Sequence, residues 1–169
     1  KIIGNDPLKD ILSRMAAEER LPGSVIFAGP DGGGKRLFAI EAARSFVCRI
    51  SSRLPCGECP ACIRAGQFTF PEADEKDDFK KVIFSNHPDV GIVAAYKRFI
   101  LVDAVRDLEN EAHFRPYEGA ARTFIVDNAE RMNDAASNAL LKTLEEPAAT
   151  SRIILISSRP DSLLPTIRS

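Results

Sequence analysis

The sequence contains no tryptophan, only 7% aromatic residues and no run of 18 uninterrupted apolar residues. Without such a run, no stretch predicts a membrane span. A net charge of −1 disfavours a protein that grips nucleic acid over its whole surface, although it leaves room for a local basic stripe. Charges interrupt the apolar part of the N-terminus, which shows no cleavage signature. We therefore expect no signal peptide and a cytoplasmic location.

A glycine-rich stretch, Gly29–Arg36 (GPDGGGKR), is the centre of the sequence. The apolar run Ser24–Ala28 before it predicts a short buried strand, and the apolar spacing after it predicts a helix from Lys35 to about Val47. Strand, glycine loop and helix form the context of a phosphate-binding P-loop, in which backbone N–H groups surround phosphate oxygens. The predicted nucleotide-binding residues here are Gly29, Gly32, Gly33, Gly34, Lys35 and Arg36.

The last position of this motif departs from the P-loop pattern. A serine or threonine normally follows the lysine and holds Mg²⁺, but this chain has Arg36, which cannot ligate a cation. The loop therefore looks suited to phosphate and unsuited to metal. The alternative is a glycine-rich turn with one solvated lysine.

A second predicted strand, Arg122–Val126, ends directly before Asp127 and Asn128. A carboxylate at such a strand end holds Mg²⁺ in P-loop enzymes, and a glutamate usually follows it to orient the attacking water. Asn128 cannot accept a proton, so the base for hydrolysis is missing; alternatively, Asp127 only caps a turn. A third strand, Ser151–Ile156, brings Ser157 to the same edge of the sheet.

All four cysteines lie between positions 48 and 62, in the spacing C-x7-C-x2-C-x2-C. Two overlapping C-x2-C steps can bring their sulfurs onto one tetrahedral zinc ion, and four thiolates leave no open position for catalysis. The sequence thus predicts a structural zinc site made by Cys48, Cys56, Cys59 and Cys62. Two disulfides or four ordinary thiols are the alternatives.

The remaining elements are predicted from apolar periodicity and from capping and stop signals. Residues 67–86 form a charged insertion, interpreted as a tolerated surface segment or as a contact arm for a partner. We expect one domain over residues 1–169 that contains a zinc module at 48–62. Helices are expected from Asp6 to about Glu19, from Asp103 to Pro116 and over Ala135–Glu146, and a strand over Val90–Ala95.

Several of these motifs resemble one known family. NALLKTLEEP (Asn138–Pro147), GPDGGGK, CGECPAC, HPD (His87–Asp89) and LLPTIRS (Leu163–Ser169) closely resemble bacterial DNA polymerase III clamp-loader subunits of the delta-prime and gamma/tau types. The resemblance spans almost the whole chain except the insertion. It implies an α/β fold of the AAA+ P-loop NTPase type, with five parallel strands flanked by helices and an inserted zinc module.

The resemblance also implies roles and partners. It places a sensor hydroxyl at Ser157, puts Ile2–Gly4 near an adenine pocket, and has Ser169 open a Ser-Arg-Cys motif whose arginine reaches a neighbour's ATP site. It implies gamma/tau and delta subunits as partners, with the sliding clamp and primed DNA engaged by the assembled complex. We expect this chain to be the N-terminal part of a longer subunit and, alone, a monomer, because the family assembles mainly through a C-terminal collar.

Three functions are compatible with the sequence. Arg36 and Asn128 both resemble the delta-prime type, so the favoured function is a non-hydrolysing assembly subunit of DNA polymerase III, with structural Zn²⁺ and without Mg²⁺. The alternatives are an ATP-hydrolysing gamma/tau-like motor and a zinc-knuckle nucleic-acid binder; near-neutral charge and few aromatics disfavour the latter. Whether ATP binds without being split is left open.

Overall fold

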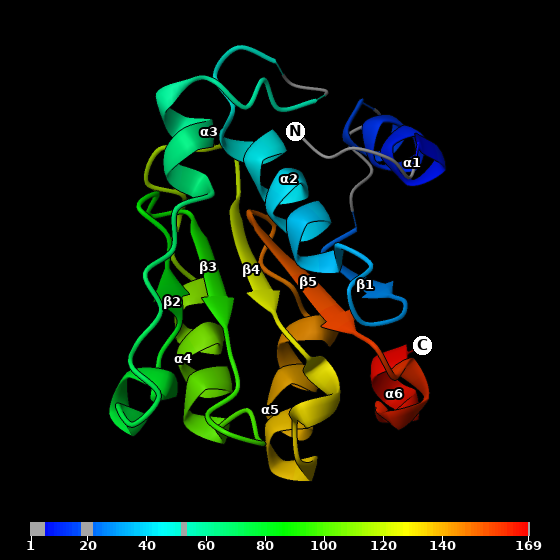
Figure 1. Cartoon of the computed structure of the whole chain (residues 1–169), viewed down its shortest axis with the longest axis vertical. Helices are drawn as coiled ribbons and strands as arrows, with labels where there is room; N and C mark the ends of the chain where they lie inside the picture. Colours follow the sequence, from blue (N-terminus) through cyan, green and yellow to red (C-terminus); the bar gives the residue numbers. More distant parts are fainter. Residues whose placement is uncertain (1–5, 18–21, 52–53, 169) are drawn as a thin grey trace.

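The computed structural model of the chain describes residues 6–17, 22–51 and 54–168. Its centre is a five-stranded sheet in the order β1-β5-β4-β3-β2, with helices on both faces (Figure 1). No helix among the described residues is long and apolar enough to cross a membrane. The strands are β1 (Ser24–Ala28), β2 (Ile83–Phe84), β3 (Val90–Val93), β4 (Arg122–Val126) and β5 (Ser151–Ser157).

Four of the strands run parallel, but β2 runs antiparallel to β3, with Ile83 opposite Ile92 and Phe84 opposite Gly91. The expectation of five parallel strands is therefore wrong at this edge. The reason is the length of the connection: only residues 85–89 join β2 to β3. A parallel crossover needs a dozen or more residues, whereas a short link suits an antiparallel pair.

The helices follow the sequence signals with small shifts. The N-cap of α4 is Leu101, and Asp103 lies in the first turn of this helix. The N-cap of α5 is Asn133, whose side chain accepts a hydrogen bond from Ala136 N (2.9 Å). The expected end of α1 at Glu19, and Ile2–Gly4 and Ser169, lie outside the described residues. The helices are α1 (Asp6–Ala17), α2 (Lys35–Val47), α3 (Pro60–Ala65), α4 (Val102–Ala112), α5 (Asp134–Glu145) and α6 (Pro165–Arg168), with 3₁₀ turns η1 (Lys76–Lys80), η2 (Ala129–Arg131) and η3 (Pro160–Ser162).

Two apolar clusters lie on the two faces of the sheet. Ile125 and Ile154 belong to the cluster with Phe38 and Ala42 of α2, whereas their neighbours in β4 and β5 belong to the cluster with α4 and α5. Successive side chains of a strand point to opposite faces, so a central strand buried on both sides is apolar throughout. This explains the continuous apolar runs of β4 and β5.

The 67–86 insertion is attached to the body at several points. Asn86 N donates to Gln67 O (2.9 Å), which closes the base of the segment, and Val82 N donates to Asp107 Oδ2 of α4 (2.8 Å). Phe79 is buried, with its ring 5.6 Å from that of Tyr96. The acidic stretch between these anchors is exposed, as expected.

Candidate functional site

The glycine loop joins the end of β1 to the start of α2 and has the backbone that its glycines allow. Gly32 and Gly34 have left-handed φ angles of 78° and 74°, a region that side chains disfavour. Gly29 N donates to Ser157 O (3.2 Å), which ties the loop to the end of β5. The loop thus lies at the carboxyl edge of the parallel strands, where α/β folds bind ligands.

Lys35, the first residue of α2, folds back over this loop. Its Nζ donates to Gly29 O (2.8 Å) and Pro30 O (2.5 Å). These bonds hold the ammonium group at the mouth of the loop, beside the N-terminus of a 13-residue helix. A positive side chain and a helix N-terminus together favour an anion at this place.

Arg36 and Asp127 form an ion pair across the carboxyl edge of the sheet. The Arg36 Nη2 donates to Asp127 Oδ2, although 90 residues separate them in the chain. The Asp127 side chain is 7% exposed and the Arg36 side chain is 50% exposed, so the carboxylate is covered while the guanidinium keeps one side open. The guanidinium also lies 5.6 Å from the ring centre of Phe70, which comes from the insertion.

The other predicted residues of this edge lie in the turns after β4 and β5. Asn128 has a left-handed φ of 53° and precedes η2, and Ser157 is fully buried with its Oγ accepting from Arg159 N (3.1 Å). The structure therefore brings the glycine loop, Lys35, Arg36, Asp127, Asn128 and Ser157 to one edge; whether they bind a nucleotide stays a prediction.

Glu130 belongs to this edge and was missed from the sequence. Ser158 Oγ donates to Glu130 Oε1 (2.8 Å). Burial by itself would raise the pKa of Glu130, but hydrogen bonds from its own backbone N–H and from the hydroxyls of Ser158 and Ser157 outweigh it, so the pKa is lowered. Its position three residues after Asp127, in the turn that leaves the strand, was the available signal.

The four cysteines converge between the end of α2 and the start of α3. Their sulfurs all lie within 4.8 Å of one another, and Cys56 Sγ is 3.9 Å from Cys62 Sγ. Tetrahedral zinc with Zn–S bonds of about 2.3 Å separates its sulfurs by about 3.8 Å, so the donor set fits this ion. All four are free thiols, which is contrary to the disulfide alternative.

Backbone amides around the cluster point at the sulfurs. Cys59 N donates to Cys56 Sγ (3.3 Å), and Cys62 N donates to Cys59 Sγ (3.5 Å). Hydrogen bonds from the backbone of Arg49 and Cys62 lower the pKa of Cys59 to about 6, whereas burial raises the pKa of Cys62. Amides that favour thiolate are the surroundings that a metal-binding cysteine needs.

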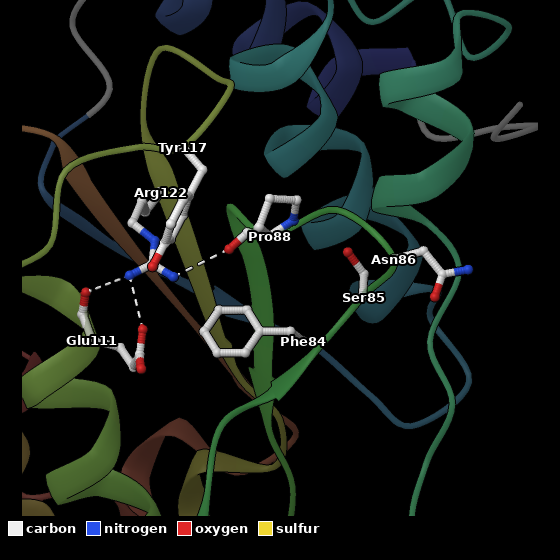
Figure 2. A pocket seen from close by; sticks show the side chains of 7 residues that line it. All are labelled: Phe84, Ser85, Asn86, Pro88, Glu111, Tyr117 and Arg122. Carbon is white, nitrogen blue, oxygen red and sulfur yellow. Dashed lines mark hydrogen bonds and ion pairs between the residues drawn. The ribbon is translucent and has the colours of Figure 1, made fainter.

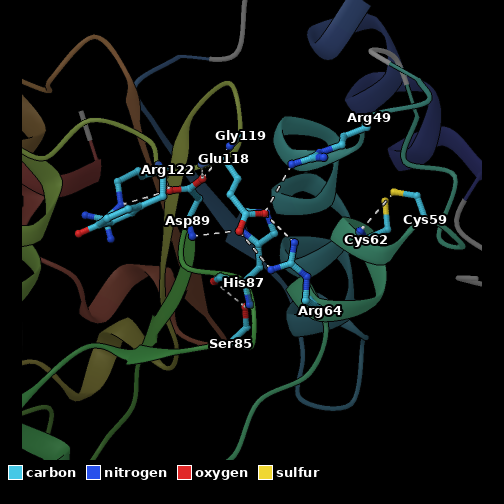
Figure 3. Close-up of polar contacts among 11 residues, drawn as sticks. Arg49, Cys59, Cys62, Arg64, Ser85, His87, Asp89, Glu118, Gly119 and Arg122 are labelled. Carbon is cyan, nitrogen blue, oxygen red and sulfur yellow. Dashed lines mark hydrogen bonds and ion pairs between the residues drawn. The ribbon is translucent and has the colours of Figure 1, made fainter.

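A polar network connects this cysteine module to the sheet (Figure 3). Arg64 of α3 donates from Nη2 to Glu118 Oε2 (2.6 Å), and Arg49 lies 3.8 Å from the same oxygen. The hydrogen bond from Arg64 lowers the pKa of Glu118. Both guanidinium groups therefore lie on Glu118.

His87 and Asp89 hold the loop that carries Glu118. Asp89 accepts hydrogen bonds from the backbone N–H groups of residues 117, 118 and 119, at 2.7, 2.8 and 2.7 Å. His87 is fully buried, its Nδ1 accepts from Asp89 N (3.1 Å), and its Nε2 lies 3.5 Å from Glu118 Oε2. Burial lowers the pKa of His87. Because Nδ1 accepts the hydrogen bond from Asp89 N, the neutral form of the ring carries its proton on Nε2.

Arg122 is the first residue of β4, and it is buried although it carries a charge. Its side chain is 1% exposed and donates to Glu111 O and Oε2 (2.7 and 2.9 Å) and to Pro88 O (3.1 Å). The guanidinium lies 5.3 Å from the ring centres of Phe84, Tyr117 and Phe124. Arg122 lines an open pocket of about 390 Å³. Figure 2 shows its side chain there, beside Phe84 and Glu111.

The family model described as "DNA polymerase III, delta subunit" matches residues 4–78 and 71–169. The chain belongs to this family. DNA polymerase III subunit delta' of Pseudomonas aeruginosa is 32% identical over 160 residues, which cover 93% of this chain and 44% of that protein. DNA polymerase III subunit gamma/tau of Mycobacterium tuberculosis is 31% identical over 170 residues, which cover 100% of this chain and 27% of that protein. The expected membership of the clamp-loader delta-prime and gamma/tau family is confirmed.

The fold agrees with this family. A DNA polymerase III gamma subunit-related protein of Thermotoga maritima superposes with a TM-score of 0.57 and 22% identity, over 96% of this chain and 42% of that protein. This likeness shows a shared α/β fold. The chain spans 27% to 44% of the length of these relatives, so the activity and partners of the whole subunit are matters for a proposal.

Proposed function

We propose that this chain belongs to a delta-prime-type subunit of the DNA polymerase III clamp loader, which assembles with ATP-hydrolysing neighbours and does not hydrolyse ATP itself. The observation that supports this most is the ion pair between Arg36 and Asp127. In hydrolysing P-loop proteins, a hydroxyl at the first of these positions and a carboxylate at the second hold Mg²⁺. Here a guanidinium replaces the hydroxyl and neutralises the carboxylate directly.

The base for hydrolysis is also missing. Asn128 stands where a glutamate usually orients the attacking water, and an amide cannot take up its proton. Glu130, two residues on, has one carboxylate oxygen bonded to the Ser158 hydroxyl. Lys35 and the glycine loop retain the features of a phosphate-binding loop. The groups that this chain lacks are therefore the metal-binding hydroxyl and the base, and not those that would bind phosphate.

The finer assignments belong to the same proposal. We assign the fold to the AAA+ type, the glycine loop to nucleotide phosphate, and the four-cysteine cluster to structural zinc. Zinc would supply local stability to a segment that leaves Ile50, Leu54 and Ile63 exposed. Gamma/tau and delta subunits are the proposed partners, with the sliding clamp and primed DNA reached through the assembled complex. The proposed location is the cytoplasm.

A gamma/tau-like motor is the second candidate. It is favoured by the match to a gamma/tau relative over the whole chain and by the retained Lys35. A motor needs Mg²⁺ at the place that Arg36 covers, which is why we prefer the assembly role.

ATP turnover separates the two functions. The full subunit alone should show no hydrolysis above background, with or without Mg²⁺ and DNA. In a reconstituted loader, Lys35→Ala should leave the rate within about twofold of wild type, like Lys142→Ala on the exposed side of α5, because neighbouring subunits perform the chemistry. A large loss from Lys35→Ala, together with turnover by the isolated subunit, would identify a motor.

A further inference from the structure

The insertion contributes a side chain to the edge of the sheet where the glycine loop lies. Phe70 is 42% exposed, and its ring centre is 5.6 Å from the guanidinium carbon of Arg36. The same guanidinium donates to Asp127. One cation therefore contacts both a nearly buried carboxylate and an aromatic ring from a segment more than thirty residues further along the chain.

The Phe70 ring is held in place by its neighbour. Phe68 stacks on it with ring centres 5.9 Å apart and an interplanar angle of 21°. Phe68 is partly buried against two apolar clusters, one between α2 and the sheet and one beneath the cysteine module. The base of the insertion is closed at Gln67 and Asn86, through a backbone bond of 2.9 Å and a side-chain bond of 3.0 Å. The aromatic pair thus has a fixed support.

We propose that Phe70 is a positioning residue that holds the guanidinium of Arg36 on Asp127, so that an intrachain cation takes the place of a divalent metal ion. This rests on the proposed function, because it treats Asp127 as the counterpart of the metal-holding carboxylate. An arginine with a half-exposed side chain has many rotamers, and pairing it with one carboxylate costs conformational freedom. A ring packed against the guanidinium restricts these rotamers and adds a cation–π attraction.

The charges at this edge follow from that arrangement. The edge holds the cations of Lys35 and Arg36 and the carboxylates of Asp31, Asp127 and Glu130. Lys35 is bonded to loop carbonyls, and Arg36 is the cation that pairs with Asp127. A divalent ion approaching Asp127 would therefore have to displace a bonded guanidinium. The insertion that looks dispensable in the sequence thereby sets the metal dependence of the edge.

Mn²⁺ is a direct probe of this inference, since it broadens the NMR signals of nearby amides. In the full chain, the amides of residues 127–129 should resist broadening at Mn²⁺ concentrations that already affect the exposed acidic stretch of residues 72–78, an internal reference for adventitious binding. Arg36→Ser should lower the Mn²⁺ concentration for half-broadening at residues 127–129 by about tenfold or more, because a full positive charge is removed from beside the carboxylate. Arg36→Lys, which keeps the charge, should stay closer to wild type.

Phe70→Ala tests the positioning role. It should lower the half-broadening concentration at residues 127–129 by roughly two- to fivefold, the range expected from one exposed cation–π contact. Phe114→Ala, at a phenylalanine after α4 that is 55% exposed, should match wild type. A loss of packing alone would not move a metal-binding signal at Asp127.

Three results would overturn the inference. These are early broadening of residues 127–129 in wild type, no broadening there in Arg36→Ser, and a Phe70→Ala protein that equals wild type. Each of them leaves the assembly role intact, because that role fails on ATP turnover by the wild-type subunit and not on Mn²⁺ binding.

Discussion

Asp89 is the residue on which we expect the connection between the sheet and the cysteine module to depend. Its side chain is fully buried and accepts three backbone hydrogen bonds from residues 117–119. Arg122 Nε lies 3.7 Å from its Oδ1. The substitution Asp89→Asn keeps the shape of the side chain, removes the negative charge and directs an NH₂ group toward N–H donors.

The structure sets the size of the expected loss. A hydrogen bond to a charged group contributes about 1.5–3 kcal/mol, and Asp89→Asn weakens three of them and breaks at least one. Arg122 keeps Glu111 at 2.9 Å, so its burial stays partly compensated. We therefore expect a loss of about 3 kcal/mol in the free energy of unfolding, near the lower end for breaking a buried charged contact. Domains of this kind have only about 5–15 kcal/mol in total.

Urea unfolding measures this loss. The midpoint should fall by about 1–1.5 M at an unchanged m-value, taking m as about 2–3 kcal/mol/M. Asp103→Asn is the matched control, because Asp103 has a side chain that is 55% exposed and an ion-pair distance of 3.8 Å to Arg106. It should cost about 1 kcal/mol or less. An Asp89→Asn protein as stable as this control would refute the reasoning.

Three further predictions follow from other contacts. Protein purified without chelator should contain about one zinc per chain and lose it in Cys59→Ser; elemental analysis without zinc, or disulfides in the folded protein, would contradict the metal assignment. Burial lowers the pKa of His87, so the unfolded chain binds the histidine proton at a higher pH than the folded chain does. The contribution of His87 to the free energy of unfolding is therefore complete above about pH 6.5 and falls as the pH is lowered. His87→Asn should flatten the decline of stability between pH 7 and 5 in denaturation experiments, and an unchanged decline would contradict this role. Gly91→Ala should lower the free energy of unfolding by about 1–3 kcal/mol in thermal or urea unfolding, since the new Cβ would lie 2.5 Å from Val82 Cγ1. A wild-type midpoint would show that the segment around β2 can shift to accept the methyl group.

Features encoded by neighbouring residues could be predicted from the sequence. β1, β4 and the bounds of α2 follow from apolar runs and from the glycine loop, and the structure has them at the expected residues. The cysteine cluster is equally local, because C-x2-C steps set the distances between sulfurs within a few residues of backbone. In each case the residues that interact are close in sequence, and the short segment between them has few alternative conformations.

Contacts between distant segments could not be predicted in this way. Nothing near Arg36 in the chain indicates that its guanidinium meets Asp127, or that Phe70 covers it. The burial of Arg122 could not be predicted because its partners come from two other segments. They are the carboxylate and carbonyl of Glu111 and the carbonyl of Pro88. A backbone carbonyl as acceptor leaves no trace in the sequence, and so a buried arginine is hard to distinguish from a solvated one.

The helix α2 connects the two candidate sites. Lys35 and Arg36 form its first turn, and Cys48 is its C-cap, so a rod of 13 residues, about 20 Å long, separates the glycine loop from the cysteine cluster. Its central residues, including Ala39 and Ala42, are buried against the sheet, and their small size allows close packing. The middle of the helix is therefore fixed independently of both ends. Removal of the proposed zinc ion should loosen the C-terminal end of α2 and α3. The geometry of Lys35 and Arg36 should persist, because the apolar contacts of Phe38, Ala39 and Ala42 with the sheet do not involve the cysteines.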